Sequence, residues 1–338
     1  MTGISYRSAA AVAAIAVGLA VGIYAYYRIK AKRTEFWPRR GAAPPQQALS
    51  EWHGIESDDV RVVDPEKLAE KLKKMAERGS EGLQVISDFD MTLSKMWQNG
   101  ERALTSHGVI EQTSRLPPEF REKVLALKQH YYPIETSPSI PREEKIHHME
   151  QWWGSAHDAF VNCRLHRDVI PQIVAETKLN LRDGCTHLFE LLHRHNVPLL
   201  VFSAGLGDII REILRQRSVF YPNMHIVSNF MEFDDQGVIS GFKGNLIHTF
   251  NKNENSVHNS DYFEEIEARN NVVLIGDSEG DPHMADGIEN IENIIKIGFL
   301  NDKVEERLPK HLSLYDIVLT GDGDMSVVNT ILRYILQV

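Results

Sequence analysis

Cysteine is scarce in this chain of 338 residues, which contains only Cys163 and Cys185. Two cysteines exclude a disulfide framework and a zinc site built from cysteines, and they fit a reducing compartment. The chain has 15 histidines, but none stands in an H-E-x-x-H arrangement or is paired with spaced cysteines. The histidines are therefore interpreted as solvated or structural residues.

The sequence also lacks an excess of positive charge. Its 37 lysines and arginines face 47 aspartates and glutamates, which gives a formal net charge of −10. The first 40 residues hold seven basic residues and one acidic residue, so the remainder carries about −16. We do not expect the part of the chain after residue 40, with this much negative charge, to bind nucleic acid polymers.

Only one uncharged stretch is long enough to cross a bilayer as a helix, at residues 9–27. Basic residues crowd its C-terminal side, and by the positive-inside rule the following domain stays in the cytosol. We predict a membrane anchor within residues 1–33, in the endoplasmic reticulum or the mitochondrial outer membrane. A cleaved signal peptide is the alternative. Without this segment the chain is expected to be soluble in the cytoplasm.

Proline and small residues mark the organisation of the N-terminal region. Residues 34–60 are expected to form a linker, because they include Pro38, Pro44 and Pro45. Gly18 and Gly22 form a G-x-x-x-G step that pairs some membrane helices, but alanine-rich spans often carry it without pairing, so a monomer is expected. The chain has no evident repeat, and its length suits one globular unit with a core and a cap.

Four short polar segments carry the functional signal, and three of them follow a short apolar run. The runs are residues 83–86, 198–202 and 271–275, which are typical of buried parallel strands. In parallel sheets, side chains beyond the carboxyl ends of the strands converge on a ligand. The sequence thus predicts an α/β fold whose site combines Asp88-Phe89-Asp90-Met91-Thr92, Ser203-Ala204-Gly205, Lys252, and the segment from Gly276-Asp277 to Asp281.

These residue types suit phosphoryl transfer, which requires that the negative charge of a phosphate ester be neutralised while a nucleophile is positioned. Asp88 and Asp277 with the backbone carbonyl of Asp90 offer the oxygen ligands that Mg²⁺ prefers. Asp88 is predicted to be a carboxylate nucleophile. Asp90, less tied to the metal, is predicted to be the proton donor and acceptor, because crowding raises the pKa of one of two neighbouring carboxyl groups.

The remaining residues of the four segments are expected to bind the phosphate. The Ser203 hydroxyl and the N–H groups of Ala204 and Gly205 are expected at the start of a helix, whose N-terminus favours anions. Lys252 adds a fixed positive charge, and Lys243 is its competitor for this role. Each segment alone is more often a turn, a cap or a solvated loop. Their shared order and strand context favour the active-site interpretation. Asp281 is expected to orient metal waters or Lys252 from behind the site.

These motifs resemble the cytosolic 5′-nucleotidase III family of the haloacid dehalogenase superfamily. The resemblance extends from about Leu68 to the C-terminus and rests on Ser87-Asp88-Phe89-Asp90-Met91-Thr92-Leu93-Ser94, Phe202-Ser203-Ala204-Gly205, Val227-Ser228-Asn229-Phe230, Gly241-Phe242-Lys243-Gly244, Phe250-Asn251-Lys252 and Leu274-Ile275-Gly276-Asp277-Ser278. It implies a Rossmann-like core and Mg²⁺-dependent release of phosphate from nucleoside 5′-monophosphates. Family members prefer pyrimidine nucleotides or also accept 7-methylguanosine monophosphate.

The resemblance also implies residue roles. Asp88 would be the nucleophile and Asp90 the proton donor, with magnesium held by Asp88, Asp90 and Asp277. Phosphate contacts would come from Ser203, Ala204 and Lys252, and Glu135 would lie in the substrate pocket.

A long insertion after the first motif is expected to form a helical cap over residues 95–179, with the core at 61–94 and 180–338. Its apolar spacing around Phe120 and Ile170 is helical. Glu135 and Trp153 are the residues best suited to hold a base, whereas Trp152 is expected to pack in the cap. Tryptophan at position 153 resembles the branch that accepts 7-methylguanosine monophosphate, whose cationic base suits an aromatic face.

One departure weakens the expected base preference, because Ala156 stands where relatives carry a serine that touches the substrate. Two other functions remain open: a phosphatase of the same superfamily that acts on a phosphorylated sugar or amino acid, and a membrane-tethered scaffold without catalysis. Asp322 and Asp324 are interpreted as a turn and a helix cap without a catalytic role.

Overall fold

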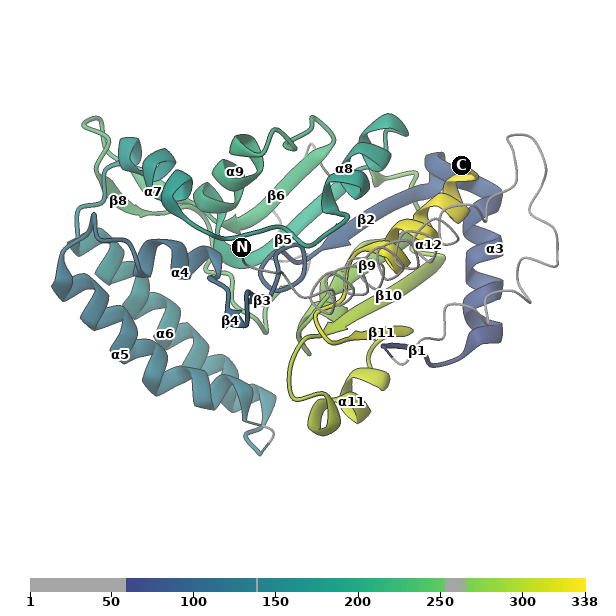
Figure 1. Cartoon of the computed structure of the whole chain (residues 1–338), viewed down its shortest axis with the longest axis horizontal. Helices are drawn as coiled ribbons and strands as arrows, with labels where there is room; N and C mark the ends of the chain where they lie inside the picture. Colours follow the sequence, from purple (N-terminus) through teal and green to yellow (C-terminus); the bar gives the residue numbers. More distant parts are fainter. Residues whose placement is uncertain (1–58, 138, 253–261, 263–265) are drawn as a thin grey trace, which may run out of the picture. The chain divides into compact units, whose positions relative to one another are not determined.

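The computed structural model describes residues 59–137, 139–252, 262 and 266–338. Within them the central feature is a seven-stranded sheet (Figure 1). In spatial order its strands are β1 (Val60–Val62), β11 (Ile317–Thr320), β10 (Asn293–Leu300), β9 (Asn271–Gly276), β2 (Leu83–Ser87), β5 (Leu199–Leu206) and β6 (Met224–Asn229). All neighbours are parallel except β1 and β11, which pair antiparallel at one edge. The predicted α/β fold with a parallel sheet is confirmed.

The three strands predicted from apolar runs occupy the middle of this sheet. Strand β2 pairs with β9 on one side and β5 on the other. All of their residues are buried except Ala204 of β5. Because the three strands are parallel neighbours, the polar motifs that follow them lie at the same edge of the sheet.

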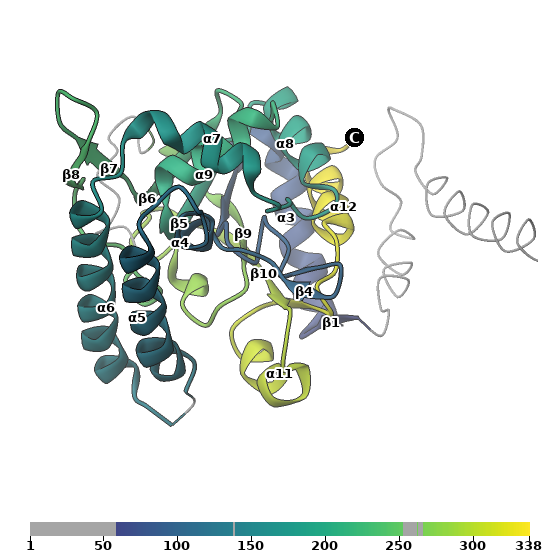
Figure 2. The same cartoon turned by 60° about the vertical axis from the view of Figure 1, so that its left-hand side comes forward.

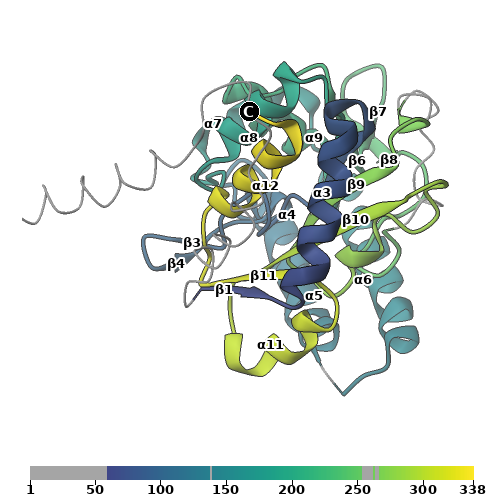
Figure 3. The same ribbon diagram turned by 90° about the vertical axis from the view of Figure 1, so that its right-hand side faces the viewer.

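Helices and apolar loops cover the two faces of the sheet, and each strand contributes alternate residues to both faces. On β9, Val273 and Ile275 face the layer formed by α3 (Pro65–Gly82), α8 (Cys185–Arg194), α9 (Gly207–Gln216) and α12 (Ser326–Leu336). Val272 and Leu274 face the opposite layer, which includes α11 (Val304–Leu312). Helices α3 and α12 lie side by side (Figure 3). This two-sided burial explains why the strand sequences are continuously apolar.

Helix α3 illustrates how the local sequence fixes an element. Asp64 precedes the helix, and its carboxylate accepts a hydrogen bond from the Lys67 N–H at 3.0 Å. Pro65 occupies the first turn, where its missing N–H has no consequence. Leu68, Leu72 and the residues that repeat this spacing are buried on one face of the helix.

The insertion between β2 and β5 is largely helical, as predicted. It contains the short strands β3 (Trp97–Gln98) and β4 (Glu101–Arg102), followed by α4 (Ser106–Glu111), α5 (Pro118–Thr136), α6 (Arg142–Asn162), the 3-10 helix η2 (Arg167–Val169) and α7 (Ile170–Glu176). Helices α5 and α6 pack side by side (Figure 2). The helices expected around Phe120 and Ile170 are α5 and α7. The residue limits proposed for cap and core stay predictions.

Two further elements complete the described core. Strand β7 (Met231–Phe233) pairs with β8 (Ile239–Phe242) in a hairpin. Helix α8 begins at Cys185. Gly184 has a left-handed φ of 89°, so the chain turns there and Arg182 lies outside the helix.

The predicted membrane anchor at residues 9–27 and nearly all of the predicted linker lie outside the described residues. Among the helices of the described part, none combines the length and the apolar character that a bilayer crossing requires. The anchor therefore stays a prediction.

Candidate active site

A cavity of about 410 Å³ and a larger one of about 910 Å³ lie in the described part of the chain. The larger cavity is bordered by core loops and by the cap helices α5 and α6. Its walls include eight of the nine predicted site residues: Asp88, Asp90, Glu135, Trp153, Ser203, Ala204, Lys252 and Asp277. The ninth, Asp281, is buried behind them. Residues that are 189 positions apart in the sequence thus share one cavity.

Three carboxylates meet where β2 and β9 end. Oxygens of Asp88, Asp277 and Asp281 all lie within 4.8 Å of one another. Asp88 follows β2 directly, and its N–H donates to the Ile275 carbonyl of the neighbouring strand at 3.0 Å. Burial raises the pKa of Asp88 to about 7, although the nearby Lys252 opposes this shift. Burial and the two neighbouring carboxylates also raise the pKa of Asp277 well above its ordinary value.

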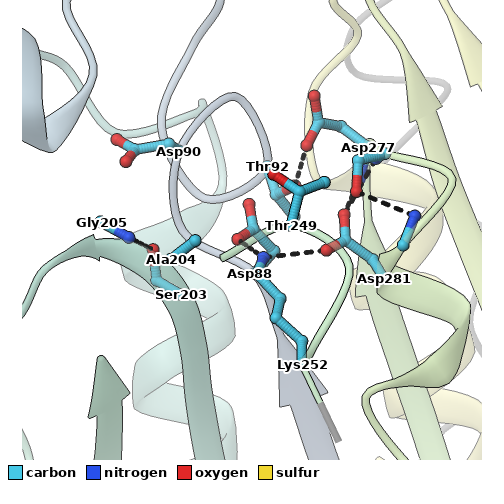
Figure 4. Close-up of polar contacts among 12 residues, drawn as sticks. Asp88, Asp90, Thr92, Ser203, Ala204, Gly205, Thr249, Lys252, Asp277 and Asp281 are labelled. Atoms are coloured by element: carbon cyan, nitrogen blue, oxygen red, sulfur yellow. Dashed lines mark hydrogen bonds and ion pairs between the residues drawn. The ribbon is translucent and has the colours of Figure 1, made fainter. Parts of the chain in front are cut away.

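Lys252 is the cation of this cluster. Its Nζ lies 2.5 Å from Oδ1 of Asp88 and 2.9 Å from Oδ1 of Asp281 (Figure 4). Burial disfavours the ammonium, but Asp281 and Asp88 outweigh burial and raise the pKa of Lys252. The lysine is therefore charged throughout the physiological pH range. Its competitor Lys243 borders the smaller cavity, beside His157 and Phe242, and is absent from the walls of the larger cavity.

Asp281 holds the loop that carries Asp277. Its Oδ2 accepts hydrogen bonds from the N–H groups of Asp277 at 3.0 Å and Ser278 at 2.9 Å, while Oδ1 contacts Lys252. A Cβ atom at Gly276 would lie 2.4 Å from the Asp281 Cβ, so only glycine allows this approach. Asp281 therefore contacts both the ammonium of Lys252 and the loop that carries Asp277, and the supporting role predicted for it stays a prediction.

Asp90 is oriented differently from Asp88. Its carboxylate points away from Asp88 in Figure 4. Both of its oxygens accept hydrogen bonds from Ser106, at 2.7 Å from the backbone N–H and 2.6 Å from the hydroxyl. Burial raises the pKa of Asp90, although the Ser106 bonds oppose that shift. The sequence did not indicate Ser106, which belongs to the cap and lies 16 residues away.

The segment Ser203-Ala204-Gly205 has a different backbone from the expected one. Strand β5 continues to Leu206, and α9 begins only at Gly207, so these residues are not at the first turn of a helix. The Gly205 N–H donates to the Ser203 Oγ at 3.0 Å rather than pointing freely toward a phosphate. The pairing register between β5 and β6 shifts between Phe202 and Leu206, so β5 continues beyond its regularly paired part.

The cap contributes the two residues predicted to hold a base. Glu135, near the end of α5, accepts a hydrogen bond from the Thr249 hydroxyl at 2.7 Å, and burial raises its pKa. Trp153, on α6, donates from Nε1 to the Ala204 carbonyl at 3.2 Å. Both bonds join the cap to core segments of the site, so these residues already face the catalytic side of the cavity.

Aromatic rings enclose the same part of the cavity. Trp152 meets Trp153 edge to face at 4.7 Å between ring centroids and stacks on Tyr131 at 5.9 Å. It also borders the cavity, as does the buried Ala156. The packing expected for Trp152 is present, but it does not remove that ring from the cavity wall. Other polar side chains of the wall were not indicated by the sequence: Arg102, His107, Tyr132, Lys145 and Thr249.

A second feature that the sequence did not indicate is a buried arginine. Arg182 is 1% exposed and donates to the carbonyls of Met91 at 2.6 Å and Thr92 at 2.8 Å. It also pairs with Asp322 at 2.9 Å. Met91 has a left-handed φ of 64°, which is unfavourable for a side chain of its kind. Arg182 thus stabilises the strained backbone between Asp90 and Thr92.

Asp322 consequently has more than the turn role expected of it. Its carboxylate also accepts from the N–H groups of Met96 at 3.1 Å and Trp97 at 2.9 Å. Asp324 is exposed and accepts from the Ser326 N–H at 2.9 Å, next to the start of α12. These contacts explain the two aspartates without a catalytic role.

Comparison with known proteins places this site in a family. The family model described as "Pyrimidine 5'-nucleotidase (UMPH-1)" matches residues 91–336. The 7-methylguanosine phosphate-specific 5'-nucleotidase A of Xenopus laevis is 48% identical over 278 residues, which are 82% of this chain and 96% of that protein. The 7-methylguanosine phosphate-specific 5'-nucleotidase of Homo sapiens is 47% identical over 277 residues, with 82% and 92% covered.

A solved structure agrees with these relatives. The crystal structure of cytosolic 5'-nucleotidase IIIB bound to cytidine has a TM-score of 0.80 and 36% sequence identity, and the match covers 86% of this chain and 97% of that one. The resemblance inferred from the motifs is therefore confirmed. The chain belongs to the pyrimidine 5'-nucleotidase (UMPH-1) family and is a 5'-nucleotidase with a haloacid dehalogenase fold.

Proposed function

We propose that this enzyme hydrolyses cytidine monophosphate and 7-methylguanosine monophosphate by transferring the phosphoryl group to Asp88. The observation that carries the proposal is the meeting of Asp88, Asp277 and Lys252 in one cavity with Glu135 and Trp153. The first three residues suit a phosphate, and the other two suit a base. A cavity of about 910 Å³ is large enough for a whole nucleotide.

The acidic cluster fits Mg²⁺. Its donors are all carboxylate oxygens, the type that a hard cation prefers, and three carboxylates surround a single ammonium. Asp88 and Asp277, with the backbone carbonyl of Asp90, are proposed to hold the ion. Asp281 is the less suitable ligand, because both of its oxygens already accept hydrogen bonds. Bound Mg²⁺ would neutralise negative charge on the phosphate oxygens.

In the first step, a carboxylate oxygen of Asp88 attacks phosphorus and the bond from phosphorus to the nucleoside 5′ oxygen breaks. Asp90 gives its proton to that oxygen, so a neutral nucleoside leaves. Asp88 then carries the phosphoryl group as an acyl phosphate. Lys252 and the Ser203 hydroxyl bind the phosphate oxygens while the charge is redistributed.

In the second step, Asp90 accepts a proton from a water molecule whose oxygen attacks the phosphorus. The bond between phosphorus and Asp88 breaks, inorganic phosphate is released and the Asp88 carboxylate is restored. Lys252 stays charged throughout, because Asp88 and Asp281 raise its pKa.

Base recognition is proposed to depend on the cap. Trp153 offers the aromatic face most favourable to the positive charge of 7-methylguanine, and Glu135 complements that charge. Two relatives are named for specificity toward 7-methylguanosine phosphate, and the solved structure contains cytidine, which supports both substrates. Ala156 lacks a hydroxyl, so a hydrogen bond worth about 0.5 to 1.5 kcal/mol is absent there.

The test of the reaction is phosphate release with Mg²⁺ from cytidine, 7-methylguanosine and adenosine monophosphates and from phosphoserine. We expect Asp88→Asn to abolish turnover and Asp90→Asn to lower it by about 10² to 10⁴. Asp324→Asn, at an exposed position, is the matched control and should be unchanged. Equal and mild effects of the first two substitutions would contradict the mechanism, and a preference for phosphoserine would identify a small-metabolite phosphatase.

The test of base recognition compares Trp153→Ala with Trp152→Ala. Loss of a desolvated cation–π contact should lower kcat/KM for 7-methylguanosine monophosphate about tenfold more than for cytidine monophosphate in Trp153→Ala. Trp152→Ala should affect the two substrates alike. A Trp153→Ala enzyme with the same substrate ratio as the unmodified enzyme would remove this argument.

The membrane anchor at residues 9–27 belongs to the same proposal, with the catalytic domain in the cytosol. Its apolar length and the basic residues on its C-terminal side support it. Fractionation of cells that express the full chain or a variant without residues 1–33 tests it. We expect only the full chain in the membrane fraction, and equal distribution of the two would contradict the anchor.

A further inference from the structure

Ser106, a residue of the cap, donates a hydrogen bond to each oxygen of the Asp90 carboxylate. The Ser106 N–H donates to Oδ1 at 2.7 Å, and the Ser106 hydroxyl donates to Oδ2 at 2.6 Å. Ser106 is completely buried. Two short bonds from one residue fix both the position and the plane of the carboxylate. The orientation that Asp90 has in Figure 4 therefore depends on Ser106.

Ser106 also connects parts of the molecule that must act together. It is the first residue of α4 and therefore belongs to the cap. Its Oγ accepts a hydrogen bond from the Leu206 N–H at 3.2 Å, at the end of β5 beside the predicted phosphate-binding segment. The preceding Thr105 caps α4 by accepting from the Gly108 N–H at 3.0 Å. Cap, strand end and Asp90 thus meet at a single hydroxyl group.

The backbone around this hydroxyl is shaped to admit it. A Cβ atom at Gly205 would lie 2.0 Å from the Ser106 Oγ and 2.8 Å from Oδ2 of Asp90. Any residue other than glycine would displace the hydroxyl or the carboxylate. Since φ of Gly205 is not in the left-handed region, close approach rather than backbone conformation explains the glycine.

We propose that Ser106 is a positioning residue that directs Asp90 for proton transfer. The inference rests on the proposed role of Asp90 as proton donor and acceptor. Each carboxyl oxygen of Asp90 has a second position besides the one to which Ser106 donates, so Asp90 can hold its proton toward the nucleoside oxygen and lose it while both Ser106 bonds persist. The Leu206 N–H fixes the hydroxyl oxygen in either case. Because the cap carries Ser106, the position of the cap also controls the proton donor.

A leaving-group experiment distinguishes this role from a structural one. A nucleoside alkoxide must be protonated as it departs, whereas p-nitrophenolate leaves readily without a proton. Single-turnover release of cytidine from cytidine monophosphate and of p-nitrophenol from p-nitrophenyl phosphate isolates the first step. We expect Ser106→Ala to slow cytidine release by about 10- to 100-fold and p-nitrophenol release by less than about threefold. Ser106→Thr, which keeps the hydroxyl, should restore most of the cytidine rate.

The controls address folding and the helix cap. Thr105→Ala removes the α4 cap but leaves the hydroxyl of Ser106, so it should not change the ratio of the two rates. If Ser106→Ala fails to fold in a thermal unfolding measurement, Ser106→Cys replaces the hydroxyl with a weaker donor of similar size and should show the same selectivity. Equal slowing of both substrates by Ser106→Ala, or by Ser106→Cys, would overturn the inference.

Asp90→Asn in the same assay separates this inference from the proposed function. If Asp90→Asn slows both substrates equally, the proton-donor role of Asp90 is wrong. If Asp90→Asn is selective and Ser106→Ala is not, Asp90 is the proton donor but Ser106 does not position it. Selectivity in both variants supports both conclusions.

Discussion

The loop that follows β2, residues 88–94, contacts two buried groups of charges that are balanced in different ways. In the first, the carboxylates of Asp88, Asp277 and Asp281 surround the single ammonium of Lys252. In the second, the Arg182 guanidinium pairs with one carboxylate, that of Asp322, and its other bonds go to neutral oxygens. We call them the acidic group and the arginine group.

The acidic group needs a ligand to balance its charge, whereas the arginine group has its partners within the protein. All three guanidinium nitrogens of Arg182 have partners in the structure, and its Cζ lies 4.0 Å from the centroid of the Phe299 ring. The acidic group has an excess of negative charge, and burial raises the pKa of two of its members. A buried charge that lacks compensation is costly, so such an excess marks a position for a cation.

The largest expected effect comes from removing a carboxylate of the acidic group. We expect Asp277→Asn to lower phosphate release by about 10³ or more, because a bound cation contributes several kcal/mol of charge stabilisation. The free energy of unfolding without Mg²⁺ should not fall, since one of several repelling charges is removed. Steady-state turnover and urea unfolding measure the two quantities. A large loss of stability together with normal turnover would show that the acidic group has a structural role instead of binding a catalytic cation.

Removal of the cation from each group should have a similar effect on stability but a different response to Mg²⁺. Arg182→Met leaves the carboxylate of Asp322 without its partner, and Lys252→Met does the same to Asp88 and Asp281. Each substitution should lower the free energy of unfolding by about 3 to 5 kcal/mol. Mg²⁺ should reduce the loss, measured relative to the unmodified protein, in Lys252→Met. In Arg182→Met, whose acidic group is intact, that loss should be the same with and without Mg²⁺. Urea unfolding of the three proteins with and without Mg²⁺ measures it, and an equal reduction in both variants would show that the groups are not distinct.

Mg²⁺ itself should stabilise the unmodified protein in a pH-dependent way. At about 100 times its dissociation constant, the ion should raise the free energy of unfolding by about 2.7 kcal/mol. Burial raises the pKa of Asp88 to about 7, and that of Asp277 also rises, so protons compete with the ion. Without Mg²⁺, the raised pKa of Asp88 in the folded protein makes the free energy of unfolding fall as the pH increases from the ordinary pKa of 3.8 to about 7.

The stabilisation by Mg²⁺ should therefore be greater at about pH 8 than at about pH 6. Thermal unfolding at both values with a Mg²⁺ titration checks this, and Asp277→Asn should remove most of the difference. A stabilisation that is independent of pH would show that these carboxyl groups do not bind the ion.

The smallest expected effect concerns Asn301, which belongs to the arginine group. It donates to the Met91 carbonyl at 2.9 Å and accepts from Arg182 at 3.1 Å. Asn301→Ala should lower the free energy of unfolding by about 1 to 3 kcal/mol, because partners are left unsatisfied. Turnover should fall by only a few fold, since Arg182 still holds the loop. A loss of turnover as large as that of Asp277→Asn would make the arginine group part of the catalytic machinery.

The acidic group could be predicted almost completely from the sequence. Asp88 and Asp277 each follow a continuous apolar run, and parallel neighbouring strands bring their ends together. The family resemblance added Glu135, which the structure places in the same cavity. The helices of the cap followed from apolar periodicity, although their limits did not.

The arginine group and the Ser106 contact could not be predicted in this way. Arg182 and Asp322 are 140 residues apart, and Ser106 stands in a segment without a motif. The backbone of Ser203-Ala204-Gly205 was also interpreted incorrectly, since β5 continues past its regular pairing with β6. In each case a contact between distant elements decides the local arrangement.

The sequence by itself determined which residues end the central strands, because the period and the length of apolar runs depend only on neighbouring positions. Tertiary structure alone decided which polar group each buried charge meets. Hydrogen bonds between segments form only where packing brings their backbones to within a few ångströms, and no local pattern encodes that approach. Asp90 shows both: its place after β2 follows from the sequence, and its orientation follows from Ser106.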